Sequence, residues 1–251
     1  MEAWYHYVLL IAVGFVVGFI NTVAGGASLI SLPVLIFLGL PPAVANGTNR
    51  VAIVLQNAAA VAGFKSKGVS TFPFNLYLGM SALVGSIIGA SIAVDIKGET
   101  FNRILAIIMI VVVVLITFKP KVKLSELQER LTGKYLWLGI LIFFFIGIYG
   151  GFINAGIGFV IILYLNLVHR MSLVRVNATK VAVVFTYTLS ALAIFIYHDK
   201  IIWKVGLVLA IGNIAGAWLS SRISVTKGDA YIKTFLIVMV MIMAVRLWFF
   251  N

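Results

Sequence analysis

The sequence predicts an all-α polytopic membrane protein made of two five-segment halves that form an inverted repeat. Three observations lead to this prediction. The chain is 63% hydrophobic and only 10% charged, its apolar runs follow one another along nearly the whole length, and motifs of the first half return in the second. A soluble domain places far more charge on its surface. Because the apolar runs lack the alternation of barrel strands, we expect about eight to ten transmembrane helical segments.

The apolar segments can be traced in order along the chain. In the first half they cover residues 6–24, 27–40, 43–64, 73–95 and 103–118. In the second half they cover residues 135–154, 157–168, 173–197, 201–221 and 230–249. The polar sequence KPKVKLSELQERLTGK separates the two sets. We therefore divide the chain into a first transmembrane repeat (1–118), a basic linker (119–134) and a second, inverted transmembrane repeat (135–251).

Three motifs recur in the same order in both halves. The GFIN sequence at 18–21 returns at 151–154, and the Asn-Gly-Thr sequence at 46–48 returns as Asn-Ala-Thr at 177–179. Two glycines spaced four residues apart, at 85 and 89, return at 212 and 216. Each motif alone is weak, but their common order predicts an internal repeat. An odd number of segments per half inverts the second half, as in many secondary transporters.

The first two segments of each half are predicted to be short or broken. Segments 27–40 and 157–168 give about 21 and 18 Å of helix, against a hydrocarbon core of about 30 Å. Each is therefore either re-entrant or part of a discontinuous helix. Irregular backbone survives in lipid only where it faces protein or a watery cavity. The glycine-rich junctions at 21–31 and 154–158 are thus the predicted substrate site.

The residue types at these junctions favour an anion. Paired glycines let backbone amides converge, a serine can cap the short helix that follows, and a helix N-terminus attracts negative charge. Arg50 and Lys180 lie about seven residues into their apolar segments, where a charge marks a site or pathway. The alternatives are close helix packing for the glycines and snorkelling to the headgroups for the two cations. The predicted substrate-binding residues are Asn21, Gly25, Gly26, Ser28, Asn46, Thr48, Asn49, Arg50, Gln56, Asn154, Gly156, Asn177, Thr179 and Lys180.

The census of reactive side chains argues against an enzyme. The chain has no cysteine, and its histidines are His6, His169 and His198. All seven acidic residues fall in a terminus, a loop or the end of a segment. This leaves no thiolate, metal cluster or acid–base pair for intramembrane catalysis, and no carboxylate for a proton relay or a sodium site. We therefore expect no catalytic residues, no cofactor and no metal site.

The net charge of +12 predicts orientation in a membrane rather than nucleic-acid binding. Most of the 19 basic residues are scattered through the loops between segments. With the segments counted in order, eleven loop Lys and Arg residues fall on one face and five on the other. The richer face contains the linker. By the positive-inside rule, the linker is predicted to be cytoplasmic and both termini to lie outside.

A family resemblance adds to this interpretation. The motif GFIN-x-x-AGG-x-SL at 18–29, the NGTNR sequence at 46–50, the GxxxG helices and the five-plus-five organisation resemble the TauE/SafE family of sulfite exporters, also called the toluene sulfonate uptake permease family. The resemblance covers almost the whole chain. It implies transport of sulfite, sulfonates, sulfoacetate or other small organic anions, often outward, at a central site between the repeats. The family's glycine-rich element corresponds to residues 21–28 and, less closely, to 154–158.

Together these observations predict a secondary transporter, a permease working as an exporter. It would move small anions such as sulfite or organosulfonates by alternating access across the inner membrane of a bacterial-type cell. An anion channel and a membrane scaffold without transport are the alternatives. Coupling stays open between downhill movement of the anion and protonation of the substrate itself. The expected partners are the small anion and membrane lipid, with no nucleic acid; the small-residue helices also allow a homodimer.

Overall fold

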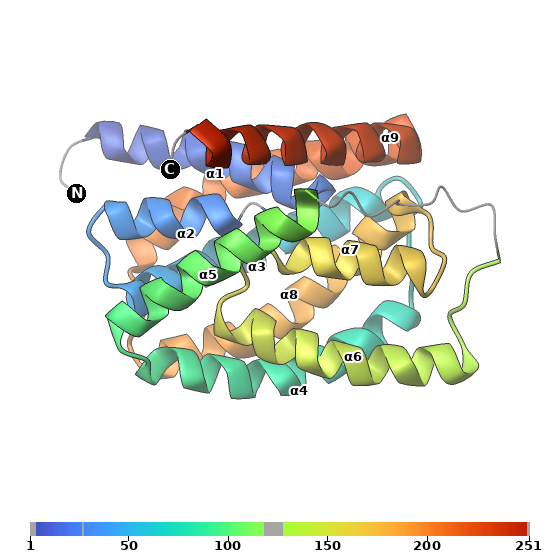
Figure 1. The fold of residues 1–251 in the computed structure, drawn as a ribbon, viewed down its shortest axis with the longest axis horizontal. Helices are drawn as coiled ribbons and strands as arrows, with labels where there is room; N and C mark the ends of the chain where they lie inside the picture. The colour runs from blue at the N-terminus through green and yellow to red at the C-terminus, as the bar shows by residue number, and fades with distance from the viewer. Residues whose placement is uncertain (1–3, 27, 118–127, 250–251) are drawn as a thin grey trace.

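The computed structural model describes residues 4–26, 28–117 and 128–249, and within them all regular secondary structure is α-helical (Figure 1). The helices of the first half are α1 (Trp4–Val23), α2 (Ser28–Phe37), α3 (Pro42–Lys65), α4 (Phe74–Asp95) and α5 (Gly98–Thr117). Those of the second half are α6 (Gly133–Phe152), α7 (Ile157–Leu167), α8 (Leu173–Tyr197) and α9 (Trp203–Phe249). Helix α9 is interrupted at Gly228, whose φ is 72°.

The helices follow the predicted apolar segments closely. The largest difference is at α9 (Trp203–Phe249), which joins the predicted segments 201–221 and 230–249 and whose first part runs to Gly228. Helix α5 begins at Gly98 rather than at residue 103. Residues 119–127 of the predicted linker lie outside the described part of the chain. Among the described residues, five helices are long and apolar enough to cross a membrane: α1, α4, α6, α8 and the part of α9 up to Gly228. The composition therefore folds into an integral membrane protein.

The shortness predicted for the first two segments of each half applies only to the second of them. Helices α1 and α6 have 20 residues each, which is enough to cross a membrane. Helices α2 and α7 have 10 and 11 residues, or about 15 and 17 Å of helix. Each short helix turns back from the end of the long helix before it (Figure 1). The chain breaks lie at these two turns.

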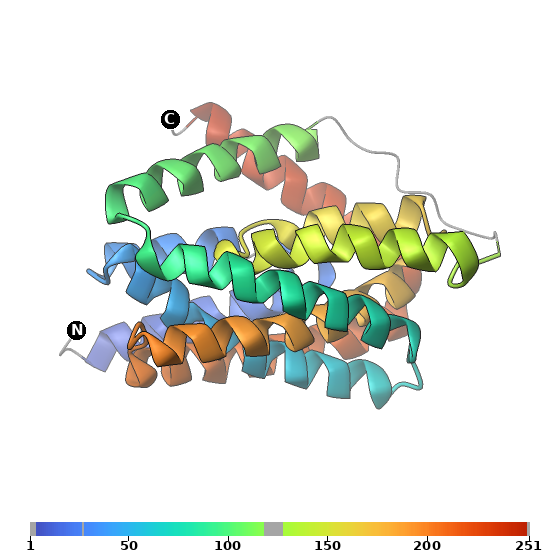
Figure 2. The same cartoon turned by 90° about the horizontal axis from the view of Figure 1, so that it is seen from below.

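The long helices form a continuous series of neighbours. Helix α1 packs most extensively on α9, and α6 packs most extensively on α4. Helices α3 and α8 join the two pairs, because α3 contacts both α9 and α8, and α8 contacts both α3 and α4. Figure 1 shows α1 and α9 along one side of the molecule and α4 and α6 along the other, and Figure 2 shows the same bundle from below. The predicted site therefore falls between α3 and α8, at the centre.

Glycines bring the two outer pairs of helices into close contact. A Cβ atom on Gly212 would clash with the backbone of α1, and one on Gly18 would clash with the backbone of α9 at Asn213. In the other pair, Gly85 stands against the backbone of α6 and Gly151 stands against the backbone of α4. Each pair of helices can approach this closely only because these positions lack side chains.

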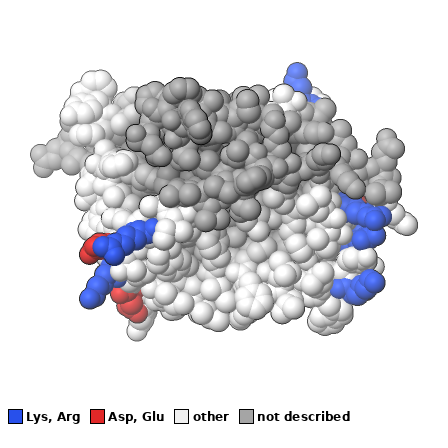
Figure 3. Space-filling model, in the orientation of Figure 1, with Lys and Arg blue, Asp and Glu red and all other residues white. Residues whose placement is uncertain are grey.

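On the face drawn in Figure 3, the described side chains are uncharged across the middle and include charged groups at the two ends. Exposed large hydrophobic side chains such as Leu76, Val84, Phe145 and Leu219 lie on the helices between the ends. Lys and Arg side chains gather at the helix ends, where Asp95 and Glu99 also lie. An apolar belt of this kind is what lipid tails require of a protein surface.

Candidate functional site

The breaks after α1 and α6 meet at the centre of the molecule. The backbone N–H of Gly158 donates to the carbonyl oxygen of Gly25 at 3.1 Å. Gly25 adopts a left-handed conformation with φ of 78°, which favours glycine. A Cβ atom on either glycine would clash with the backbone of the other. The two breaks can therefore touch only because both positions are glycine.

Asn154 shapes the second break. It follows the end of α6 with φ of 58°, and asparagine is one of the few side-chain-bearing residues that adopt this conformation readily. The hydroxyl of Tyr187 donates to Oδ1 of Asn154, and the hydroxyl of Tyr149 donates to the carbonyl of Ala155. Gly156, also left-handed with φ of 72°, then starts α7. Side chains from α6 and α8 thus hold this turn in place.

Lys180 of α8 binds the end of α1. Its ammonium group donates to the carbonyl oxygens of Asn21 at 3.0 Å and Thr22 at 2.8 Å, and to Oδ1 of Asn177 at 2.8 Å. Asn177 in turn donates to the carbonyl oxygen of Val23 at 3.1 Å. The last carbonyls of a helix lack partners within it and carry partial negative charge. A cation of the second half therefore stabilises the end of a helix in the first half.

Arg50 of α3 binds the end of α6 in the same way. Its guanidinium donates to the carbonyl oxygens of Gly150 at 2.5 Å and Gly151 at 2.8 Å, and to Oδ1 of Asn46 at 3.2 Å. Asn46 donates to the carbonyl oxygen of Phe152 at 2.7 Å. The exposed fractions of Arg50 and Lys180 are 0% and 2%. Neither cation snorkels to the surface, because both are buried against helix ends.

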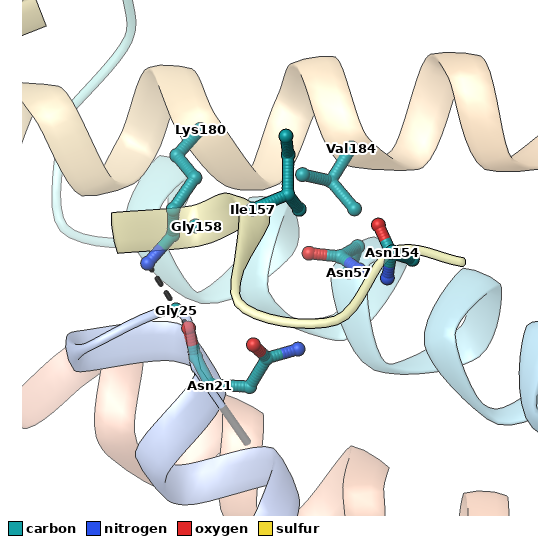
Figure 4. A pocket seen from close by; sticks show the side chains of 8 residues that line it. All are labelled: Asn21, Gly25, Asn57, Asn154, Ile157, Gly158, Lys180 and Val184. Atoms are coloured by element: carbon teal, nitrogen blue, oxygen red, sulfur yellow. Dashed lines mark hydrogen bonds between the residues drawn. The ribbon is translucent and has the colours of Figure 1, made fainter. Parts of the chain in front are cut away.

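A small cavity of about 10 Å³ lies where the breaks meet. A cavity of this volume holds about one water molecule. Figure 4 shows the lining side chains, which come from α1, α3, α8 and both breaks. The lining residues are Asn21, Gly25, Asn57, Asn154, Ile157, Gly158, Lys180 and Val184. The structure thus brings four of the predicted residues, namely Asn21, Gly25, Asn154 and Lys180, into one cavity wall.

Of the four other lining residues, Ile157 and Gly158 fall inside the predicted junction 154–158, whereas Asn57 and Val184 were not among the predicted substrate-binding residues. Asn57 follows Arg50 by two helical turns and Val184 follows Lys180 by one turn. Helical spacing places such residues on the same face as the cation before them, so this signal was present. Ile157 and Gly158 open α7 and belong to the second glycine-rich junction.

The remaining predicted residues do not line the cavity. Asn46, Asn177 and Arg50 support the helix ends. Thr48 accepts from the backbone N–H of Ile202, Thr179 donates to Thr71 or the carbonyl of Arg175, and Gln56 accepts from Asn213. Gly26 packs against the ring of Phe159, Gly156 caps α7, Ser28 is buried at the start of α2, and Asn49 is buried on α3.

Comparison with known proteins places the chain in a family. Residues 10–247 match the family described as sulfite exporter TauE/SafE. A probable membrane transporter protein of Haemophilus influenzae is 30% identical over 239 residues, which cover 95% of this chain and 93% of that protein. The probable membrane transporter protein YfcA of Escherichia coli K12 is 28% identical over 95% of this chain and 88% of its own length. No solved structure is significantly similar. The chain belongs to the sulfite exporter TauE/SafE family of membrane proteins.

Proposed function

We propose that the protein is a secondary transporter that exports small anions such as sulfite or organosulfonates across the cytoplasmic membrane by alternating access. One observation carries the proposal: the breaks after α1 and α6 meet around a cavity that Lys180 and three asparagines help to line. Membership of the family and the names of its relatives support membrane transport as the activity.

The charges around the cavity favour an anion over a cation. Helix α7 begins there with Ile157 and Gly158, and the N-terminus of a helix carries partial positive charge. Lys180 adds a full positive charge. No acidic side chain of the described residues lines the cavity. A cation would be repelled by Lys180 and would find no carboxylate in the cavity wall, whereas an anion would offset a buried positive charge.

The tightness of the cavity favours alternating access over an open channel. Its volume of about 10 Å³ is too small for an anion, since about one water molecule fills it. The contact between Gly25 and Gly158 must open before substrate enters. A channel needs a continuous path, but a transporter passes through a state in which the site is closed to both sides.

Matching contacts in the two halves support an inverted repeat within this proposal. Lys180 binds the end of α1 as Arg50 binds the end of α6. Helix α1 packs on α9 through glycine as α6 packs on α4. We interpret α1 with α2, and α6 with α7, as helical hairpins that enter from opposite faces of the inner membrane and meet at their tips. The linker would lie in the cytoplasm and both termini outside, as the basic loops favour.

Uptake into proteoliposomes tests this function. Proteoliposomes that contain the wild type, Lys180→Met or Lys134→Met receive labelled sulfite under an imposed membrane potential. Unlabelled sulfonates and carboxylates serve as competitors. Lys134 is exposed and serves as the matched control. We expect the uptake of sulfite by the wild type to saturate and to be inhibited by other sulfur anions. Uptake should fall at least about tenfold in Lys180→Met but not in Lys134→Met, because a buried charge contact is worth more than 1.4 kcal/mol. Absence of uptake of every anion by the folded wild type would favour the scaffold.

A further inference from the structure

Three asparagine side chains line the cavity, and two of them are almost completely buried. Asn21 comes from the last turn of α1, Asn57 from α3 and Asn154 from the break after α6 (Figure 4). The exposed fractions of Asn57 and Asn154 are 2% each. Buried carboxamides need hydrogen-bond partners, and the cost of leaving one unpaired is large in an apolar interior. The side-chain oxygen and nitrogen atoms of these asparagines that have no partner in the described part of the protein therefore indicate which hydrogen-bonding groups a ligand must have.

Asn57 offers the cavity a hydrogen-bond acceptor. Its Nδ2 donates to the carbonyl oxygen of Ile53 at 2.7 Å, which leaves Oδ1 for the cavity. No donor among the described residues reaches this oxygen. A carboxamide oxygen can only accept. A ligand that satisfies Asn57 must therefore bring a hydrogen of its own.

The other groups offer donors and charge. Oδ1 of Asn154 is taken by the Tyr187 hydroxyl, so Nδ2 is the atom left for a ligand. The side chain of Asn21 makes no hydrogen bond with the described residues. The three N–H bonds of the Lys180 ammonium are already used by Asn21, Thr22 and Asn177. Lys180 thus contributes its charge to the cavity but no free donor.

The charge balance matches one negative charge. Lys180 faces the carbonyl end of α1, which carries roughly half a negative charge and offsets about half of the ammonium charge. The N-terminus of α7, which begins at the cavity with Ile157 and Gly158, adds about half a positive charge, so about one positive charge is left in the wall. A monoanion neutralises this sum. A dianion would leave an excess negative charge in a dry interior, which is costly.

We infer that the site selects the monoprotonated form of a small oxyanion, and that Oδ1 of Asn57 accepts the hydrogen of its O–H group. This inference rests on the proposed function and adds to it the protonation state of the substrate. Bisulfite has the required pattern: one negative charge, oxygens that accept from Asn154 and Asn21, and one O–H. Fully deprotonated sulfite would place an oxygen anion against Asn57, and a sulfonate has no hydrogen to donate. Each transported bisulfite then carries a proton with it, so a pH gradient can drive its transport, whereas a sulfonate would move without a proton.

Equilibrium binding separates this inference from transport itself. Labelled sulfite is bound to the purified full-length protein in detergent, at pH values below and above the second ionisation of sulfurous acid. Methanesulfonate, whose charge is constant over this range, is the competitor and reports any effect of pH on the protein. The variants are Asn57→Leu, which removes the acceptor at similar volume, and Asn57→Thr, whose hydroxyl can donate to Ile53 and still accept.

We expect the wild type to bind total sulfite more weakly as pH rises, in step with the loss of bisulfite, while methanesulfonate binding stays constant. Asn57→Leu should bind bisulfite about tenfold more weakly, with little effect on methanesulfonate, and Asn57→Thr should keep the pH profile. Tighter binding at higher pH, or an equal loss for both anions in Asn57→Leu, would overturn the inference. Sulfite binding with the expected profile but no uptake would contradict the proposed transport while supporting the inferred site.

Discussion

At the scale of single residues, the sequence predicted that Lys180 and Arg50 belong to the site but not which groups they bind. Both were predicted to be intramembrane cations of a site, from their position about seven residues inside their apolar segments. Their partners could not be predicted, because each binds the backbone of the opposite half, about a hundred residues or more away. Such contacts depend on how the helices pack, and no local spacing encodes them. Asn57 and Val184 were in principle accessible, since helical spacing relates them to the two cations.

Gly158 provides a test at this scale. In Gly158→Ala, the added Cβ would clash with the backbone of Gly25, so the tips of the two breaks could no longer touch. We expect sulfite uptake to fall about tenfold or more, with destabilisation of about 1–3 kcal/mol from overpacking. Proteoliposome uptake and thermal unfolding in detergent measure the two effects.

Gly98→Ala is the matched control, because a Cβ there meets Pro42 only at 3.5 Å. Uptake by the control should be close to that of the wild type. Full uptake by Gly158→Ala would mean that the contact between the tips has no part in the transport cycle.

At the scale of helices, the sequence predicted the order of the elements well and the breaks only in part. The apolar runs fix where helices form, because lipid leaves few other options. The repeated glycines, however, serve two purposes that composition cannot separate. Gly25 lies in a break, whereas Gly151 lies inside α6 and allows close packing on α4. Only the three-dimensional neighbours of each glycine distinguish a turn from a packing site.

The glycine contacts of α9 and α4 give a prediction for these helices. A Cβ on Gly212 would meet the backbone of α1, and one on Gly85 would meet the backbone of α6, in similar ways. We expect Gly212→Ala and Gly85→Ala each to lower stability by about 1–3 kcal/mol. Thermal unfolding in detergent checks this, with Gly98→Ala again as control. A large loss in one variant and none in the other would contradict the equivalence of the two interfaces.

The start of α6 and the loop between α7 and α8 are joined through His169. Its Nδ1 donates to the carbonyl oxygen of Arg130 at 2.7 Å, and the backbone N–H of Arg130 donates back to the carbonyl oxygen of His169 at 3.0 Å. The ring packs between Phe74 and Tyr164. Burial lowers the pKa of His169, and the bond to the Arg130 backbone partly opposes this shift. The histidine therefore stays neutral in the fold.

A pH dependence of stability follows. Because the pKa is lower in the folded state, the unfolded chain binds the proton first as pH falls through the usual value of about 6.5. The contribution of neutral His169 is complete above this pH and is lost progressively below it. We expect the midpoint temperature of thermal unfolding to decrease as the pH is lowered below about 6.5. The decrease should be smaller in His169→Gln, whose side-chain amide can still donate to the carbonyl oxygen of Arg130. An identical pH slope in both proteins would contradict this role.

At the scale of the whole molecule, the central claim is that two helical hairpins meet at a cavity that opens to each side in turn. The membrane class and the position of the central junction could be predicted from composition and repeats. The closed state of the junction could not, since it depends on the contact between Gly25 and Gly158. Because the sequence contains no cysteine, a single introduced thiol can report access to the cavity.

The most direct measurement is therefore the labelling of Val184→Cys by a membrane-impermeant thiol reagent, added in turn to each side of vesicles that contain the protein. Val184 lines the cavity and is 6% exposed, and Lys134→Cys, at an exposed position, is the control. The account predicts slow labelling from both sides, with saturating sulfite protecting the thiol. Labelling from neither side, while the control reacts fully, would contradict alternating access at this cavity.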